Sequence, residues 1–411
     1  MTQTAEPLGR RDGSLRIALI CPYSLTIPGG VQGQVLGLAR ALRRLGHEVR
    51  VLGPCDGAPP ETYVTPLGDS LPTAVNGSIA PLAPDPSAAL RTIRALRDEA
   101  FDVLHVHEPL SPGPSMTTLL MHTAPIVATF HAAGDSASYR YLNSIVRNLA
   151  NSIDLRFAVS KDALQLAERY LGGEYEVLPN GVELDRYLDS QDPDTQGHQL
   201  RERAIFFCGR HEPRKGLEVL LQAHRDLASD VELWIASDGP ETARLMREYG
   251  DDPRIQWRGR ISDTEKLDLL RRATIFCAPS LGGESFGVVL LEAMASGTTV
   301  VASAIDGYQN VATDGVDALL SIPGDVESLR VALQHALNDD DLRARLTDSG
   351  RRRADEFSMV SLADSYVTAY RRAISGESTA PVKRSYSSRV LRVVRACAAL
   401  LRRWLGRRMS S

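Results

Sequence analysis

The order in which short apolar segments, glycine turns and helical segments follow one another constrains the fold of this 411-residue chain more than any other feature. Residues 15–21 (LRIALIC) form an apolar run, the turn PGG follows, residues 34–49 have helical spacing, and RVLGP is a second apolar run. Strand, turn, helix and strand in this order form the βαβ unit of a parallel sheet. The alternation continues through residues 101–171 and predicts one doubly wound domain.

The alternation breaks at the polar, turn-rich residues 188–204 and restarts with AIFFCGR. We therefore predict an α/β chain with two Rossmann-like domains that face each other across a cleft, where the carboxyl ends of parallel strands bind ligands. The predicted parts are a disordered N-terminus (1–14), an N-terminal domain (15–185), a C-terminal domain (200–356), a helix at about 357–375 that crosses back to complete the first domain, a linker (376–388) and a basic amphipathic helix (389–411).

Composition and charge exclude several classes of protein. The chain is 43% hydrophobic and 24% charged, as a soluble globular protein is, and no apolar run approaches the roughly 20 residues of a membrane span. The polar N-terminus lacks a hydrophobic signal region, so we expect a cytoplasmic protein. Five scattered cysteines without a CxxC pair indicate reduced structural thiols. The net charge is −4, yet the segment from Lys383 onward carries nine positive charges and no acid, which leaves −13 on residues 1–382.

Residues 282–297 (GGESFGVVLLEAMASG) place two glutamates eight positions apart around an apolar run. A helix at Val288–Leu291 would be buried all round, and a buried charge is costly unless it is paired or hydrogen-bonded. The free N–H groups at the predicted helix start suit an anion, while Glu284 and Glu292 suit hydroxyl groups, Glu292 those of a ribose. The structural alternatives are helix capping for Glu284 and a buried ion pair for Glu292.

Two further turns have a composition that suits phosphate. In FCGRHEPRKG, Arg210 and Lys215 follow a strand, where two cations can meet a diphosphate. The alternative is a surface turn with solvated charges. In PGG, Gly29 and Gly30 precede a helix and allow a phosphate or sugar to approach the backbone, although a tight turn without a ligand also accounts for them.

Three histidines lie at predicted strands. His131 ends one strand (TFHA), and a lone histidine is usually structural. His105 and His107 alternate on another strand and face the same side, whereas Glu108 is expected on the other face. This pattern lacks a complete set of ligands, so we predict no metal site.

Taken together, these stretches resemble the retaining glycosyltransferases of family 4, which have the GT-B fold. The motifs that carry the resemblance are GGESFGVVLLEA, with its two glutamates, GRHEPRKG and PNGVELDRY. The stretches CPYSLTIPGGVQGQVLGLARALRRLGHEV, FDVLHVHEP, PIVATFHA and APSLGGESFGVVLLEAMASGTTVVAS are similar in particular to the actinobacterial phosphatidylinositol α-mannosyltransferases. The similarity runs from about Arg16 to Arg372.

The resemblance implies a role for each matching residue. The implied donor-binding set is Gly29, Gly30, Gly209, Arg210, Lys215, Lys266, Glu284, Ser285, Phe286, Gly287, Val288 and Glu292. Within it, Arg210 and Lys215 would neutralise the donor diphosphate, Glu284 would hold sugar hydroxyls, Glu292 would bind the ribose, and Lys266 would lie near the base. The implied catalytic residues are His131, Arg210, Lys215 and Glu284, and the implied acceptor-binding residues are Tyr23, Gln32, Asn76, Ser78 and His131.

The acceptor half departs from the subfamily pattern. After the NGS turn, where the subfamily has arginines, this chain has Pro81 and Ala83. Thr26 replaces an acidic residue within YSxxxPGG, and Ala132 replaces a hydroxyl-bearing residue after His131. These changes remove charge and hydrogen bonds from the place where inositol phosphate would sit.

We therefore expect a retaining hexosyltransferase that transfers mannose from GDP-mannose to a lipid such as phosphatidylinositol, without a cofactor or metal. The alternative is another nucleotide sugar with a different lipid or soluble acceptor. A two-domain oxidoreductase is disfavoured because no strand opens into GxGxxG. A non-catalytic sugar-nucleotide sensor is disfavoured by the complete set of charged residues. We predict no nucleic-acid partner and infer no protein partner.

Two basic segments suggest contact with an anionic membrane. Arg91, Arg94 and Arg97 recur at helical spacing, and the tail repeats the pattern more strongly. The tail residues concerned are Arg392, Arg395, Arg402, Arg403 and Trp404. A disordered tail or a nucleic-acid contact is the alternative. We expect a peripheral location on the inner face of the plasma membrane.

Overall fold

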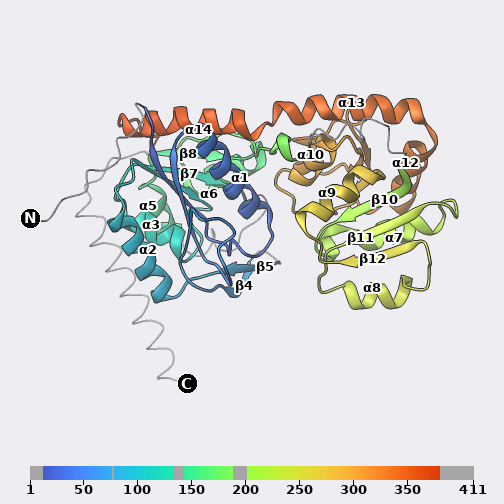
Figure 1. The fold of residues 1–411 in the computed structure, drawn as a ribbon, viewed down its shortest axis with the longest axis horizontal. Helices are drawn as coiled ribbons and strands as arrows, with labels where there is room; N and C mark the ends of the chain where they lie inside the picture. Colours follow the sequence, from blue (N-terminus) through green and yellow to red (C-terminus); the bar gives the residue numbers. More distant parts are fainter. Residues whose placement is uncertain (1–12, 76–77, 133–142, 188–200, 380–411) are drawn as a thin grey trace, which may run out of the picture. The chain divides into compact units, whose positions relative to one another are not determined.

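The computed structural model describes residues 13–75, 78–132, 143–187 and 201–379, which form two units (Figure 1). The N-terminal unit runs to Leu178 and resumes at Val360, and the C-terminal unit spans Pro179–Met359. Each unit is built on its own parallel sheet, so the predicted pair of Rossmann-like domains is confirmed.

The N-terminal unit contains a seven-stranded sheet in the order β3-β2-β1-β6-β7-β8-β9, with every pair parallel. Its strands are β1 (Arg16–Ile20), β2 (Glu48–Gly53), β3 (Val64–Pro66), β6 (Val103–His107), β7 (Ile126–Phe130), β8 (Leu155–Ala158) and β9 (Glu176–Val177). Its helices are α1 (Gly30–Arg44), α2 (Pro86–Asp98), α3 (Pro114–Met121), α5 (Asn143–Ala150), α6 (Lys161–Leu171) and α14 (Met359–Ile374). The strand order reverses direction between β1 and β6, so the segments that follow these strands border the expected ligand position.

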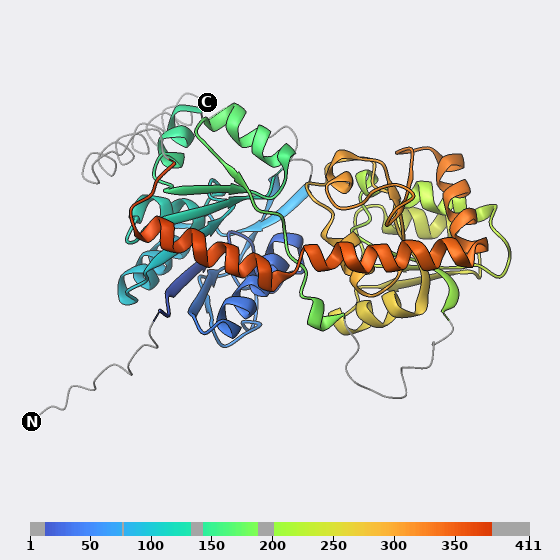
Figure 2. The ribbon, with the colours of Figure 1, turned by 90° about the horizontal axis from the view of Figure 1, so that it is seen from above.

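Two features of this unit lie outside the simple βα alternation. The strands β4 (Leu71–Val75) and β5 (Ser78–Leu82) form an antiparallel hairpin. Helix α14, red in Figure 2, comes from the far end of the sequence and packs its buried Tyr366 and Tyr370 against β6 and β7. The helix predicted at about 357–375 is therefore present.

The C-terminal unit has a six-stranded parallel sheet in the order β12-β11-β10-β13-β14-β15. Its strands are β10 (Glu202–Cys208), β11 (Glu232–Ala236), β12 (Ile255–Gly259), β13 (Ala273–Ala278), β14 (Thr299–Ser303) and β15 (Leu319–Ser321). Its helices are α7 (Leu217–Arg225), α8 (Thr242–Tyr249), α9 (Asp263–Arg272), α10 (Val288–Ala295), α11 (Asp306–Gln309), α12 (Val326–Asn338) and α13 (Asp340–Glu356), with short 3-10 turns η1 (Leu184–Arg186) and η3 (Pro213–Lys215).

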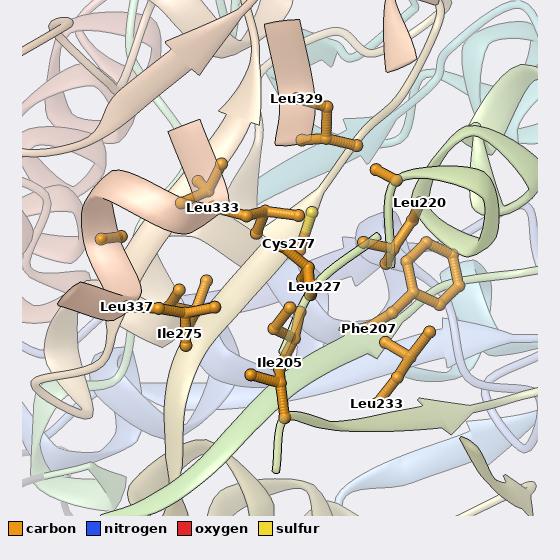
Figure 3. Close-up of a cluster of buried hydrophobic side chains, with 14 of the residues drawn as sticks. Ile205, Phe207, Leu220, Leu227, Leu233, Ile275, Cys277, Leu329, Leu333 and Leu337 are labelled. Atoms are coloured by element: carbon orange, nitrogen blue, oxygen red, sulfur yellow. The ribbon is translucent and has the colours of Figure 1, made fainter. Parts of the chain in front are cut away.

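The core of this unit explains why its strands read as apolar runs. Ile205 and Phe207 of β10 and Ile275 and Cys277 of β13 point to the same face of the sheet, where they pack with leucines of α7 and α12 (Figure 3). Strands of a parallel sheet are covered on both faces, so they carry little polar alternation. Cys21, Cys55, Cys208 and Cys277 are free thiols.

Helix α10 corrects one expectation. Leu290 and Leu291 are buried, but Val288 and Val289 are only partly buried, and the Glu292 side chain is 17% exposed. The helix is therefore not buried all round, because its first turn lies at the rim of the sheet. The basic helix expected at residues 389–411, with Arg392, Arg395, Arg402, Arg403 and Trp404, lies outside the described residues, and so does most of the predicted N-terminal and linker segments. Within the described ranges, no helix is long and apolar enough to cross a bilayer.

Candidate active site

A cluster of charged side chains in the C-terminal unit lies beyond the carboxyl ends of β10 and β13. These two strands are neighbours at the point where the strand order of the sheet reverses, which is where α/β sheets bind ligands. Arg210 and the turn η3 follow β10, and Glu284 with the start of α10 follows β13. The topology thus brings two sequence segments, about 70 residues apart, to one edge.

Glu284 is the centre of this cluster. Its Oε1 lies 2.6 Å from the Lys215 Nζ and 3.1 Å from the Arg214 Nη1, and it also accepts a hydrogen bond from the Ser280 Oγ at 3.3 Å. The Glu284 side chain is 15% exposed and the Lys215 side chain 19%. Helix α10 begins after the N-cap Gly287, which has no side-chain cap, so Glu284 is not a helix cap. Its two shortest contacts are with cations.

Glu212 extends the cluster and was not predicted. It is buried, its Oε2 accepts a hydrogen bond from the Arg214 Nε at 2.9 Å, and its Oε1 forms an ion pair with the Arg210 Nε at 3.2 Å. Positive and negative groups therefore alternate along one chain of contacts: Arg210, Glu212, Arg214, Glu284 and Lys215. Three cations against two carboxylates leave this edge of the sheet with an excess positive charge, which suits an anion.

Glu292 anchors a second, smaller cluster on α10. Its Oε1 accepts from the Lys266 Nζ at 2.9 Å and from the Tyr187 hydroxyl at 3.1 Å. Burial lowers the pKa of Lys266, but the adjacent Glu292 carboxylate outweighs this and holds the pKa above its usual value. The ion pair considered for Glu292 is thus formed, with Lys266 as its partner. Both bonds end on Oε1.

The loop that leads into α10 requires glycine at one position. Gly287 has φ +93°, and a Cβ there would lie 2.8 Å from the Tyr308 ring. The Tyr308 hydroxyl and the Ser280 Oγ are 2.9 Å apart, and Ser280 in turn bonds Glu284. The backbone at the helix start and the Glu284 carboxylate are therefore held by the same set of contacts. Phe286 is buried against Phe357, whereas Ser285 is partly buried.

In the N-terminal unit, the segment after β1 holds several predicted residues. Gly29 is the N-cap of α1, and both it and Gly30 are exposed. Gln32 is buried, and its Nε2 donates to the Ile27 carbonyl at 3.2 Å, so it braces the loop before the helix. Tyr23 forms an isolated bridge with the end of β5. Of the other predicted acceptor residues, Ser78 begins β5, and Asn76 lies outside the described residues.

His131 lies beyond β7 in a buried cluster with the two histidines of β6. Its Nε2 and the His107 Nδ1 are 2.9 Å apart, and the rings of His105 and His107 lie 4.3 Å apart between centroids. The His105 ring bonds the Tyr370 hydroxyl at 2.7 Å and the Thr129 Oγ1 at 2.8 Å. His105 and His107 therefore face the same side, as predicted.

Glu108 corrects the expectation that it lies away from the histidines. Its backbone turns at φ +44°, directly after β6, and its carboxylate accepts from the His131 backbone N–H at 2.7 Å. Because β6 ends at His107, the alternation of side chains along the strand no longer determines the face on which the Glu108 side chain lies. Even so, the described part of the chain contains no group of three or more side chains placed to hold a metal ion.

The histidine cluster should make the stability of the protein depend on pH. Burial lowers the pKa of His105 to about 3 and of His131 to about 4, and that of His107 well below its usual value. The unfolded state therefore binds more protons than the native state below about pH 6.5, so stability should fall as the pH drops from 6.5 toward 4. Burial also raises the pKa of Glu108 to about 7, so this carboxyl binds a proton more readily in the native state and stabilises it at low pH. This single proton opposes, but does not cancel, the loss of stability caused by the three histidines.

The free energy of unfolding is measured by urea denaturation at pH 7.5, 6.0 and 5.0. His105→Gln removes one of the three protons, so its loss of stability should be shallower by up to about 1.4 kcal/mol per pH unit. His335→Gln, which removes an exposed imidazole, is the matched control for the loss of a histidine. Equal slopes for all three proteins would show that His105 is charged in the native state.

Comparison with known proteins identifies the family to which the chain belongs. The model described as "Glycosyltransferase Family 4" matches residues 28–186, and that described as "Glycosyl transferases group 1" matches residues 190–353. The phosphatidyl-myo-inositol mannosyltransferase of Mycobacterium leprae is 39% identical over 363 residues, which are 87% of this chain and 96% of that protein. The chain belongs to glycosyltransferase family 4. The enzyme of the same description from Mycolicibacterium smegmatis is 40% identical, with 80% of this chain and 86% of that protein covered.

Solved structures show the same fold for this family 4 glycosyltransferase. Anabaena HepE in complex with UDP and glucose superposes with a TM-score of 0.68 at 19% identity, covering 86% of this chain and 99% of that one. WaaG, a glycosyltransferase involved in lipopolysaccharide biosynthesis, gives a TM-score of 0.63 at 19% identity, covering 88% and 100%. The predicted GT-B architecture is confirmed.

Within this fold, Glu212 should hold two of the arginines at the positively charged edge. Glu212→Gln keeps the volume of the side chain but loses the charge that orients the Arg210 and Arg214 Nε atoms, which are themselves partly exposed. We expect the KM for the nucleotide sugar to rise about tenfold, with a smaller change in kcat. Glu218→Gln, which breaks a pair with Arg244 on α8, is the matched control and should leave KM unchanged. A wild-type KM for Glu212→Gln would contradict the orienting role.

Proposed function

We propose that this family 4 glycosyltransferase transfers mannose from GDP-mannose to phosphatidylinositol or a related inositol lipid, with retention of configuration. Two relatives named phosphatidyl-myo-inositol mannosyltransferase are 39% and 40% identical to this chain over most of its length. The observation that carries the proposal is a pair of carboxylates: Glu284 is held by Arg214 and Lys215 beyond the ends of β10 and β13, and Glu292 on α10 is held by Lys266.

The donor contacts follow from the two clusters. Arg210 and Lys215 would bind the diphosphate, and the start of α10 would take the distal phosphate on its free N–H groups. Glu284 would accept bonds from sugar hydroxyls. Glu292 has both of its protein partners on Oε1, which would leave Oε2 for the ribose diol, and Lys266 would lie near the base.

The mechanism uses the charge of the leaving group. Departure of the diphosphate develops negative charge, and Arg210, Lys215 and the α10 N-terminus would stabilise it electrostatically. A phosphate oxygen of the same leaving group would help to take the proton of the acceptor hydroxyl, so attack comes from the face that the diphosphate leaves. The cations of the chain would supply the positive charge, and we expect transfer to continue in EDTA.

We assign the acceptor to the N-terminal unit, where the proposed contacts include fewer charged side chains than at the donor site. Tyr23, Gln32 and His131 would border it. Pro81 and Ala83 have uncharged side chains, so neither offers a cation to a lipid phosphate. The Pro81 carbonyl accepts from the Ser24 N–H at 2.9 Å, and Ala83 is fully buried. This departure favours testing acceptors with and without the inositol phosphate group.

The proposed donor and acceptor are tested by an assay of sugar transfer to lipid with the full-length chain. GDP-mannose, UDP-glucose and ADP-glucose, each with a radiolabelled sugar, are incubated with vesicles of phosphatidylinositol or of phosphatidylglycerol, and the lipid product is isolated. We expect label from GDP-mannose in phosphatidylinositol, released by an α-mannosidase. Label that enters only from UDP-glucose or ADP-glucose would replace the proposed donor, and label from GDP-mannose that enters only phosphatidylglycerol would replace the proposed acceptor.

Membrane binding is proposed for the outer face of α2. Ala88, Thr92 and Leu96 are buried, while Leu90 is 66% exposed and lies with Arg94 and Arg97 on the opposite face. Arg91 is exposed at the side of the helix, where its Nη1 donates to the Leu67 carbonyl at 3.3 Å. Such a face attracts anionic lipids, with about 1 kcal/mol per basic residue.

Arg94→Glu with Arg97→Glu should weaken co-sedimentation with phosphatidylglycerol vesicles at least tenfold. Arg345→Glu with Arg352→Glu on α13 changes the net charge equally and should not. Truncation at residue 382 measures the separate contribution of the basic tail. If both double variants weaken binding alike, net charge rather than the α2 face accounts for the attraction.

A further inference from the structure

The contact between His107 and His131 fixes more than the position of two rings. Both side chains are at least 94% buried, since 2% of His107 and 6% of His131 is exposed. Burial keeps such imidazoles neutral at physiological pH, so each carries one N–H. In the 2.9 Å contact between the His107 Nδ1 and the His131 Nε2, one nitrogen must donate and the other accept.

The other nitrogen of His107 decides the direction of this bond. The His107 Nε2 is inaccessible to solvent and has no hydrogen-bond partner among the described residues. A proton on Nε2 would leave a donor buried without an acceptor, and orphaned N–H groups are rarer in proteins than unsatisfied acceptors. The proton therefore belongs on Nδ1, where it is donated to the His131 Nε2.

We propose that His107 is a positioning residue that fixes His131 as the Nδ1–H tautomer, so that His131 meets the substrate as a hydrogen-bond donor and not as a base. The inference rests on the proposed function for the identity of the substrate, a sugar or inositol hydroxyl oxygen. With the His131 Nε2 lone pair occupied by His107, the other ring nitrogen, Nδ1, carries the proton and can only donate. The acceptor proton must then leave by another route, in line with uptake by the departing diphosphate.

The His107 ring is itself held in place. It lies between two rings, with centroids 4.3 Å from His105 and 5.2 Å from His131, the latter stacked at 23°. His105 cannot rotate freely, because Tyr370 and Thr129 occupy both of its nitrogens and Thr129 is also bonded to Tyr366 at 2.8 Å. Helix α14 therefore sets the plane of His105, which in turn supports His107.

The first test needs no substrate. Long-range ¹H–¹⁵N spectra of the full-length protein, with only histidine labelled and His107→Asn and His131→Asn used for assignment, report which nitrogen of each ring is protonated. We expect the Nδ1–H pattern for both rings at pH 7.5. An Nε2–H pattern for His131 would overturn the proposal, whether or not GDP-mannose is a donor.

The second test separates positioning from structure. His107→Leu removes the donor and should lower kcat about tenfold or more, with the KM for GDP-mannose within twofold of wild type. His107→Asn can place an N–H near the former Nδ1 and should recover most of the turnover. His335→Leu, at an exposed histidine, controls for histidine loss. Wild-type turnover in folded His107→Leu would overturn the positioning role, while absence of transfer by the wild type would contradict only the proposed function.

Discussion

Replacing Lys215 by alanine should lower turnover by about two to three orders of magnitude. The Lys215 ammonium lies at the edge of β10 and β13, largely buried, and is bonded to a carboxylate at 2.6 Å. A cation in such a position is already oriented and poorly hydrated, so it stabilises a developing phosphate charge more than a lysine in water would. Arg210→Ala should have an effect of the same order, because its guanidinium is held by Glu212 at the same edge.

The measurement is single-turnover transfer from radiolabelled GDP-mannose, with the thermal midpoint recorded for each variant. Lys161→Ala, at the exposed start of α6, is the matched lysine control and should retain wild-type turnover. Lys215→Arg keeps the charge but changes the shape of the head group, and we expect partial activity. Near-wild-type turnover by Lys215→Ala would remove this residue from the site.

Sequence alone predicted those parts of the fold and site that depend on short-range order. Strand, turn and helix recur at fixed spacing, and parallel strands gather their carboxyl ends, so Arg210, Lys215 and Glu284 were expected at one edge. The structure brings Lys215 and Glu284 into contact. Their roles in catalysis stay predictions, since geometry places side chains without assigning chemistry.

Other parts of the site depend on side-chain direction, which spacing does not give. Glu212 and Arg214 lie inside the motif GRHEPRKG, but their signs alone do not show that Glu212 turns inward and bonds two arginines. The 3-10 turn at Pro213–Lys215 sets those directions. The signal available in the sequence was a single acidic residue among three cations in one motif.

Contacts between segments that are distant in the sequence also could not be predicted from the sequence alone. His105 and Tyr370 are 265 residues apart in sequence, and their bond follows only from the packing of α14 on the first sheet. Tyr187 likewise reaches Glu292 across 105 residues. Helical periodicity predicted that α14 has a buried face, but not that two tyrosine hydroxyls on that face would satisfy a histidine and a threonine.

Glu284→Gln should affect the transfer of the sugar without weakening the binding of GDP. The carboxylate engages Lys215 and Arg214 and adds negative charge where a diphosphate is proposed to bind. Removing that charge should leave GDP affinity unchanged or improved, since like charge near a phosphate weakens its binding. Transfer of mannose should nevertheless fall about a hundredfold, because the sugar hydroxyls lose a charged acceptor that strengthens as the reaction proceeds.

The opposite response is expected at the other glutamate. Glu292→Gln should weaken GDP itself about tenfold, as the ribose diol and Lys266 lose a charged partner, while the rate of the bound donor changes less. Isothermal titration with GDP and single-turnover transfer measure the two quantities, and Glu327→Gln at an exposed position of α12 is the control. Equal losses of GDP affinity and turnover in Glu284→Gln would assign that carboxylate to holding Lys215 and Arg214 in place. A contrast between the two variants would instead assign Glu284 to the sugar and Glu292 to the nucleoside.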